Sequence, residues 1–333
     1  MLNFIDYKTK DYLKDCNMMM KNMKHILITG GSGLIGKKIT GLLERKGYEV
    51  AWLSRSPGDY DQKSFHWDLK KQEIDQEAIE WADGIIHLAG AGVADKRWTA
   101  DRKKAILQSR TMSTALLKNA VEKSSNKPGV FVSASAVGFY GFNTGEELQD
   151  EKASPGSDFL AQVVTAWEDE VSKVKELGVR TVMLRIGIVL AKEGGALVEM
   201  MKPPVAAPLG SGKQWMSWIQ VDDLARMFVF ALEKEDVEGI FNAVGPNPIT
   251  NAELTKKAAK KISKTFINIG VPGFGLKLIL GEMAQMVLGG NRVSSKKIQE
   301  TGFEFRYPRL DEALEKIYSR GEDKSSSRGS LSH

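Results

Sequence analysis

The chain has 333 residues, 42% of them hydrophobic, with a net charge of +5 and a pI near 9.0. This length is sufficient for a complete doubly wound domain and a smaller lobe, and a single cysteine, Cys16, excludes a disulfide framework and a cysteine metal site. The mildly basic balance is typical of a solvated surface, and it also suits an anionic ligand such as a dinucleotide phosphate.

The two ends of the chain are expected to lie outside the fold. Residues 1–22 have no uninterrupted apolar stretch, so they predict an N-terminal extension rather than a signal peptide or a membrane anchor. Residues 319–333 are polar and rich in serine, which predicts a disordered tail. These features favour a cytoplasmic protein with no membrane partner.

An apolar run at 25–29 leads into a glycine-rich turn and then into an apolar helix at 34–47. This strand–turn–helix pattern is typical of a dinucleotide-binding element. Gly30 allows the tight turn, Gly33 lets backbone approach a pyrophosphate, and Gly36 lets the helix pack close to the strand. The N–H groups and positive dipole at the helix start would face the phosphates. The residues predicted to contact the cofactor here are Gly30, Gly31, Ser32, Gly33, Leu34, Ile35 and Gly36.

Strand and helix patterns then alternate along most of the chain. This alternation predicts a parallel sheet with helices on both faces, which is a Rossmann-like, doubly wound α/β fold. Residues 23–249 would form this domain, with a substrate-side loop at about 191–218 that is rich in glycine and proline. The predicted strands are 49–54, 64–67, 84–89, 129–134, 180–186 and 239–244, and the predicted helices are 99–122, 158–177 and 221–234.

Residues 250–318 are expected to form a small, mostly helical C-terminal lobe. An apolar helix predicted at 272–288 is too short and too interrupted by charge to span a bilayer, so we expect it to pack over a substrate cleft or against the second subunit of a homodimer. Five lysines fall on one helical stripe without interleaved aromatic residues, which predicts a solvated face and no nucleic-acid partner. They are Lys256, Lys257, Lys260, Lys261 and Lys264.

The end of the second strand favours NADP(H) over NAD(H). NAD enzymes usually place a carboxylate there to hold the ribose 2′-hydroxyl, whereas this chain has Ser54 and Arg55. A guanidinium offers a planar cation to a 2′-phosphate and can stack on adenine. We therefore expect NADP(H) as the preferred cofactor; the alternative is a surface arginine at a strand end.

From residue 23 to residue 318 the chain resembles an extended short-chain dehydrogenase/reductase. More narrowly, it resembles an atypical branch of the NAD-dependent epimerase/dehydratase family, the "epimerase family proteins", which end in a small lobe of unassigned function. The stretches that carry the resemblance are the glycine turn and residues 53–55, 87–91, 97–99, 109–110, 133–141, 167–168, 184–190, 194–197, 210–215, 218–223 and 251–308.

The resemblance implies further site residues at the ends of the later strands. Asp68 matches the family position that accepts a hydrogen bond from the adenine amino group, and Ser135 matches the active-site serine that bonds a substrate hydroxyl or carbonyl. The other positions implied to lie near the cofactor are Leu88, Ala89, Gly90, Arg110, Arg185 and Gly187.

The tyrosine and lysine that the wider superfamily uses for proton transfer are absent. In the family, a lysine four residues after the tyrosine lowers its pKa, but here the helix has Phe159 and Val163 at those places. Tyr140 is the nearest alternative donor, and Asp158 and Glu168 are further candidates.

Two functions therefore remain open. The first is an NADP(H)-dependent oxidoreductase or epimerase that acts on a small polar substrate, with Ser135 and Tyr140 as catalytic residues. The second is a non-catalytic NADP(H)-binding regulatory or scaffold protein. The histidines show no metal-ligand spacing, so no metal site is expected.

Overall fold

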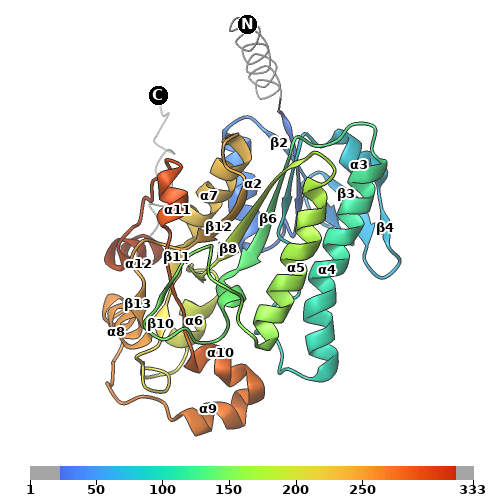
Figure 1. Ribbon diagram of the computed structural model, residues 1–333. Coiled ribbons are helices and arrows are strands. Elements are labelled where there is room, and N and C mark those ends of the chain that lie inside the picture. The colour runs from blue at the N-terminus through green and yellow to red at the C-terminus, as the bar shows by residue number, and fades with distance from the viewer. Residues whose placement is uncertain (1–22, 320–333) are drawn as a thin grey trace, which may run out of the picture.

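The computed structural model describes residues 23–319 (Figure 1). The expected N-terminal extension, Cys16 and all but the first residue of the expected tail lie outside this range. Within it, the eight-stranded main sheet has the order β12-β8-β6-β5-β1-β2-β3-β4. Its strands are β1 (His25–Thr29), β2 (Glu49–Ser54), β3 (Ser64–Asp68), β4 (Glu73–Ile74), β5 (Gly84–His87), β6 (Val130–Ala136), β8 (Arg180–Ile186) and β12 (Gly239–Ala243).

All neighbouring strands of this sheet are parallel except β3 and β4, which pair antiparallel. The strand order reverses between β1 and β5, because β2 and β3 extend the sheet on one side and β6, β8 and β12 extend it on the other. The predicted doubly wound α/β fold is therefore confirmed, and the crevice at which such folds bind ligands lies beyond the carboxyl ends of β1 and β5.

Helices cover both faces of the sheet. In Figure 1, α4 (Ala100–Lys123) and α5 (Phe159–Lys175) lie side by side over one face, while α2 (Leu34–Arg45) packs against α7 (Val221–Glu233). The short α3 (Gln76–Trp81), which the sequence pattern did not predict, contacts α4. The central strands β1, β5, β6 and β8 are buried on both faces over almost their whole length, as is usual for a parallel sheet covered by helices on both sides.

The smaller lobe is not a single segment of the chain. Its core combines residues from the stretch expected to be a loop, such as Leu197 and Met216, with residues from Leu254 to Ile317. The loop itself contains α6 (Ala196–Met201) and β10 (Trp215–Met216), and β10 pairs antiparallel with β13 (Ile249–Thr250).

Short elements connect this lobe to the main domain. They are η1 (Val137–Tyr140), β7 (Leu148–Gln149), β9 (Ile188–Leu190), β11 (Trp218–Gln220), β14 (Arg292–Val293) and α11 (Lys296–Glu300). β9 pairs with β11 and β7 with β14, and Ile298 of α11 lies in the core of the main domain. The remaining helices are α8 (Asn251–Lys261) and α12 (Leu310–Tyr318).

The expectation of one apolar helix at 272–288 was wrong. The segment forms α9 (Gly273–Leu280), a single 3₁₀ turn η2 (Gly281–Met283) and α10 (Ala284–Leu288). Gly281 has a φ of +61°, a left-handed conformation that ends α9. Within residues 23–319, no helix has the length and apolar character needed to cross a membrane.

Candidate cofactor and catalytic site

The glycine turn closes tightly against the end of β5. Gly30 has a φ of +70°, and a Cβ built on it would lie 3.2 Å from the backbone nitrogen of Ala89. A Cβ at Gly36 would collide with the backbone of Gly30 and Gly31. Glycine is therefore required at both positions, and the turn brings the predicted residues at 30–36 and 88–90 together.

The start of α2 is open to a ligand. Gly33 is the N-cap residue, it has no side chain to cap the helix, and the first turn carries no acidic residue. Ser32 and Gly33 are exposed, whereas Gly31 is buried against the indole of Trp52. Uncapped N–H groups beside an exposed glycine are a suitable site for phosphate oxygens. The residues present thus fit a dinucleotide pyrophosphate.

A buried histidine connects this turn to β5 and α4. Thr29 Oγ1 accepts hydrogen bonds from the backbone N–H groups of Leu88 and Ala89, each at 3.1 Å, and lies 2.7 Å from His87 Nδ1. Because both lone pairs of that hydroxyl are used, its hydrogen must be donated to Nδ1. His87 Nε2–H then donates to Thr114 Oγ1 at 3.1 Å, which assigns the tautomer.

The imidazole of His87 is held neutral by this environment. Burial, together with the nearby charge of Arg110, lowers the pKa of His87 to about 3. A second proton, on Nδ1, would also face the hydroxyl hydrogen that Thr29 directs at this nitrogen. His87 therefore stays an uncharged connector between the phosphate turn and the next strand.

Arg110 lies beside Gly90, just after the end of β5. Its Nη1 donates to the backbone oxygens of Ala91 and Ile106, each at 3.0 Å. A Cβ at Gly90 would lie 3.1 Å from the guanidinium carbon. Burial lowers the pKa of Arg110 to about 10, so the group remains a cation at neutral pH.

The residues predicted to hold the adenosine end are at the carboxyl ends of β2 and β3. Arg55 is exposed, and Ser54 Oγ accepts from the backbone N–H of Ser56 at 3.1 Å. Asp68 Oδ1 accepts from the backbone N–H groups of Lys70 and Lys71, and these bonds lower the pKa of its carboxyl group. Asp68 thus shapes the β3–β4 turn and remains ionised.

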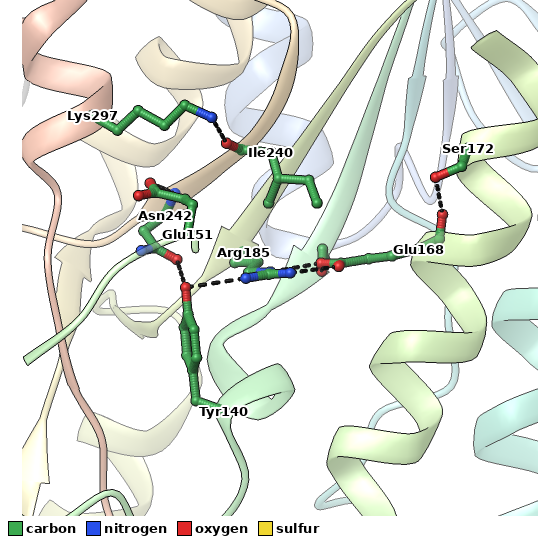
Figure 2. Close-up of polar contacts among 9 residues, drawn as sticks. Tyr140, Glu151, Glu168, Ser172, Arg185, Ile240, Asn242 and Lys297 are labelled. Carbon is green, nitrogen blue, oxygen red and sulfur yellow. Dashed lines mark hydrogen bonds and ion pairs between the residues drawn. The ribbon is translucent and has the colours of Figure 1, made fainter. Parts of the chain in front are cut away.

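The hydroxyl of Ser135 is committed to a buried ion pair. Its Oγ donates to Glu168 Oε1 at 2.5 Å, and Glu168 accepts two further bonds at 2.8 Å from Nε and Nη2 of Arg185 (Figure 2). Ser135 is only 3% exposed. Its proton therefore points into the protein, and only its lone pairs are left to face a ligand.

Tyr140 belongs to the same network (Figure 2). Its hydroxyl donates to Asn242 Oδ1 at 2.7 Å and accepts from Arg185 Nη1 at 3.2 Å. Burial raises the pKa of Tyr140 despite the neighbouring Arg185. The geometry is that of a packed aromatic side chain whose hydroxyl is bonded on both sides within the protein.

Arg185 and Gly187, both implied by the resemblance to lie near the cofactor, have partners inside the protein. The guanidinium carbon of Arg185 lies 3.4 Å from the centroid of the Phe139 ring. Burial by itself lowers the pKa of Arg185, but the hydrogen bonds to Glu168 and its negative charge outweigh burial, so the pKa is raised. A Cβ at Gly187 would collide with the backbone of Ser217. These contacts give both residues a structural reason that needs no cofactor.

The start of α5 replaces the usual acid–base pair with an apolar cluster. Phe159 packs edge-on against Trp98, with ring centroids 5.0 Å apart, and Val163 is buried. Asp158 is the N-cap residue: its Oδ1 accepts from Leu160 and Ala161, and its Oδ2 accepts from the N–H of Phe142. The candidate carboxylate at 158 is therefore used in capping.

Sequence reasoning named Ser135, Tyr140, Glu168 and Arg185 separately, but it did not predict that they form one network. It missed Asn242, which lies 102 residues from Tyr140 in the chain, and it gave no role to the side chain of His87. The one usable signal was that buried strands β5 and β12 each contain a polar residue in an apolar run, because such residues need a partner inside the protein.

Comparison with known proteins supports the interpretation of the fold. Residues 26–244 match the model of the NAD dependent epimerase/dehydratase family, and residues 271–317 match a domain of unknown function, DUF1731. Epimerase family protein YfhF of Bacillus subtilis is 34% identical over 299 residues, which are 88% of this chain and 97% of YfhF. The chloroplastic SDR39U1 homolog of Arabidopsis thaliana is 33% identical over 320 residues, 93% of this chain and 91% of that protein.

A solved structure of human epimerase family protein SDR39U1 with NADPH has a TM-score of 0.79 and 30% sequence identity, and the match covers 88% of this chain and 98% of that one. A nucleoside-diphosphate sugar epimerase from Corynebacterium glutamicum has a TM-score of 0.72 and 28% identity, over 93% of this chain and 63% of that chain.

Proposed function

The chain belongs to the NAD-dependent epimerase/dehydratase family, and from this premise we propose that it binds NADP(H) at the carboxyl ends of β1, β2 and β5. The observation that carries the proposal is the uncapped, exposed start of α2 at Gly33, closed against β5 by Gly30. The similar human protein has been solved with NADPH. When bound, a nicotinamide supplies a hydride donor or acceptor.

NADP(H) is the proposed cofactor rather than NAD(H). Arg55 is exposed directly after β2, where a 2′-phosphate would lie, and its guanidinium can form charge-assisted bonds with phosphate oxygens. No carboxylate stands at Ser54 or Arg55 to accept from a ribose 2′-hydroxyl.

The proposed activity is that of an oxidoreductase or epimerase acting on a small polar substrate. The family membership supports it, together with the doubly wound sheet and the second lobe at its carboxyl edge. Ser135 and Tyr140 would serve this activity by holding the end of β6 and η1 in place, because both hydroxyl protons are bonded within the protein.

A second candidate, a non-catalytic NADP(H)-binding regulatory or scaffold protein, is favoured by a specific observation. Phe159 and Val163 form an apolar cluster where the superfamily has its acid–base pair. Turnover would then need another proton donor, and a protein without one would bind the cofactor and go no further.

Calorimetric titration with NADPH and NADH tests the binding. Gly33→Val should abolish NADPH binding and leave the fold intact, because a Cβ there meets only the carbonyl oxygen of Gly30, at 3.2 Å, while the branched side chain would hold phosphates away from the helix. Gly41→Ala on the same helix is the matched control, since its Cβ meets only the flexible end of Arg45. Normal NADPH affinity in Gly33→Val would refute the proposed site.

A further inference from the structure

An ion pair joins the two halves of the molecule beside the apolar cluster at the start of α5. Lys103 Nζ, on the first turns of α4, lies 2.5 Å from Oε1 of Glu282 in η2. The same Nζ lies 5.1 Å from the centroid of the Phe159 ring. The ammonium group is therefore next to the ring that stands in place of the family's tyrosine.

The chain between α9 and α10 is shaped to place Glu282 there. Leu280 and Met283 pack into the cluster formed by Trp98 and Phe159, so the turn between them is anchored on both sides. The left-handed φ of Gly281 reverses the chain, and a Cβ at Gly281 would lie 2.8 Å from Nε of Arg97. The cations Arg97 and Lys103 and the carboxylate of Glu282 thus lie at the same edge.

Other groups that could transfer a proton near this place are already bonded. Ser135 donates to Glu168, Tyr140 donates to Asn242, and the Asp158 carboxylate caps α5. Lys103 differs because its ammonium carries three protons and only one is needed for the bond to Glu282. Its side chain is 29% exposed and that of Glu282 is 41% exposed, so the pair can exchange protons with water.

We propose that Lys103 is the proton donor and acceptor of this protein, and that Glu282 is the residue that positions it. This inference rests on the proposed cofactor function. In the reducing direction, a hydride from the cofactor forms the new C–H bond at a substrate carbonyl carbon, and the C=O π electrons move to oxygen. The oxygen takes a proton from Lys103 Nζ, the N–H bond breaks, and the neutral amine recovers a proton from water. The carbonyl is reduced to an alcohol and the cofactor is oxidised.

The two cations at this edge also affect which substrate would bind. Arg97 and Lys103 would stabilise the negative charge that develops on the carbonyl oxygen, and they favour a substrate that is itself anionic. A structural role alone, in which the pair merely fastens η2 to α4, is the competing explanation, and the experiments below separate the two.

The first experiment needs no substrate. The protein is labelled with acetic anhydride with and without saturating NADPH, and acetylation of Lys103 and of Lys118, which is paired with Glu122 further along α4, is measured by peptide mass spectrometry. We expect NADPH to slow labelling of Lys103 at least about threefold and to leave Lys118 unchanged. An unchanged rate at Lys103, with NADPH binding confirmed by calorimetry, would overturn the inference and leave the proposed function standing. Absence of NADPH binding would refute the proposed function itself.

The second experiment uses an arginine that keeps the ion pair but cannot release a proton. Lys103→Arg should keep the wild-type melting temperature and lose about 100-fold or more of the hydride-transfer rate, measured by NADPH absorbance with a panel of aldehydes, ketones and keto acids. Lys118→Arg is the matched control and should keep full activity. Full activity in Lys103→Arg would show that the Lys103–Glu282 ion pair has only a structural role. A panel without any turnover, with NADPH bound, would also count against Lys103 as a proton donor and favour the non-catalytic candidate.

Discussion

The buried His87 predicts a specific loss of stability in mild acid. In the folded protein its pKa is lowered to about 3 by burial and by the charge of Arg110, whereas an unfolded chain has a histidine pKa of about 6.5. Between about pH 3 and about pH 6.5 the histidine is protonated in the unfolded state and neutral in the folded state. The free energy of unfolding must therefore rise with pH across this window, and fall as the pH drops from about 6.5 towards 3.

The magnitude follows from the width of that window. One pKa unit corresponds to about 1.4 kcal/mol, so at about pH 5 the histidine should cost roughly 2 kcal/mol of stability relative to neutral pH. His87→Gln removes the titration but keeps an acceptor for Thr29 and a donor for Thr114 and Ser113, the hydroxyls that the imidazole contacts. The variant should be less stable than the wild type at pH 7 and should lose about 2 kcal/mol less between pH 7 and pH 5.

Urea denaturation followed by circular dichroism at the two pH values measures the difference directly. His66→Gln controls for the removal of a histidine from another strand of the same sheet, β3. His87→Asn replaces His87→Gln should the longer amide fail to fold. An equal loss of stability between pH 7 and pH 5 in the wild type and in His87→Gln would contradict the neutral, Nε2-protonated imidazole deduced from the Thr29 bonds.

Three further predictions test other parts of the molecule. Arg55→Asp should weaken NADPH binding about tenfold or more and leave NADH binding unchanged or improved, as measured by calorimetry; equal affinities of the wild type for both cofactors would contradict the proposed preference. Glu168→Gln should lower the free energy of unfolding by about 3–5 kcal/mol, because it leaves the buried guanidinium of Arg185 without its counter-ion. Its control is Glu253→Gln, which loses an exposed ion pair with Lys257 and should leave the melting temperature almost unchanged. The exposed side chains of Phe274, Leu278 and Ile279 on α9, with Ile267 and Ile269, present on the order of 600 Å² of apolar surface, which is enough to bury about 1,200 Å² in a symmetric dimer. Leu278→Glu should therefore raise the dissociation constant of the dimer measured by sedimentation, whereas Leu148→Glu should not change it. A wild-type protein that stays monomeric at high concentration would refute the homodimer.

The parts of the site that could be predicted from the sequence are those set by local backbone geometry. Gly30 and Gly36 are required because a side chain at either place would meet backbone within a few residues or on the adjacent strand. Such constraints are visible in the sequence as glycines at fixed spacing. The same is true of the alternating strands and helices, whose burial follows from the continuous apolar runs.

The roles of Ser135 and Tyr140 depend on partners that spacing cannot reveal. Glu168 reaches Ser135 from α5, Arg185 joins them from β8, and Asn242 reaches Tyr140 from β12, so the network exists only once the sheet has formed. The lysine stripe illustrates the same limit. Lys257 and Lys261 pair with Asp311 and Glu315 of α12, which no helical pattern within α8 could indicate.

The buried pair of Glu168 and Arg185 and the missing acid–base pair have a common structural consequence. A carboxylate and a guanidinium removed from water are stable only when most of their hydrogen-bonding groups have partners. Here Ser135 donates a further bond to Glu168, and Tyr140 accepts one from Arg185. Two hydroxyls at the carboxyl edge of the sheet are thereby bonded within the protein, and they fix β6 against β8. If the protein turns over a substrate, its proton must come from outside this network. Lys103, whose Nζ lies 5.1 Å from the centroid of the Phe159 ring, and its partner Glu282 lie outside this network and are partly exposed. The contacts that occupy Ser135 and Tyr140 therefore direct the search for the acid to the contact between α4 and η2.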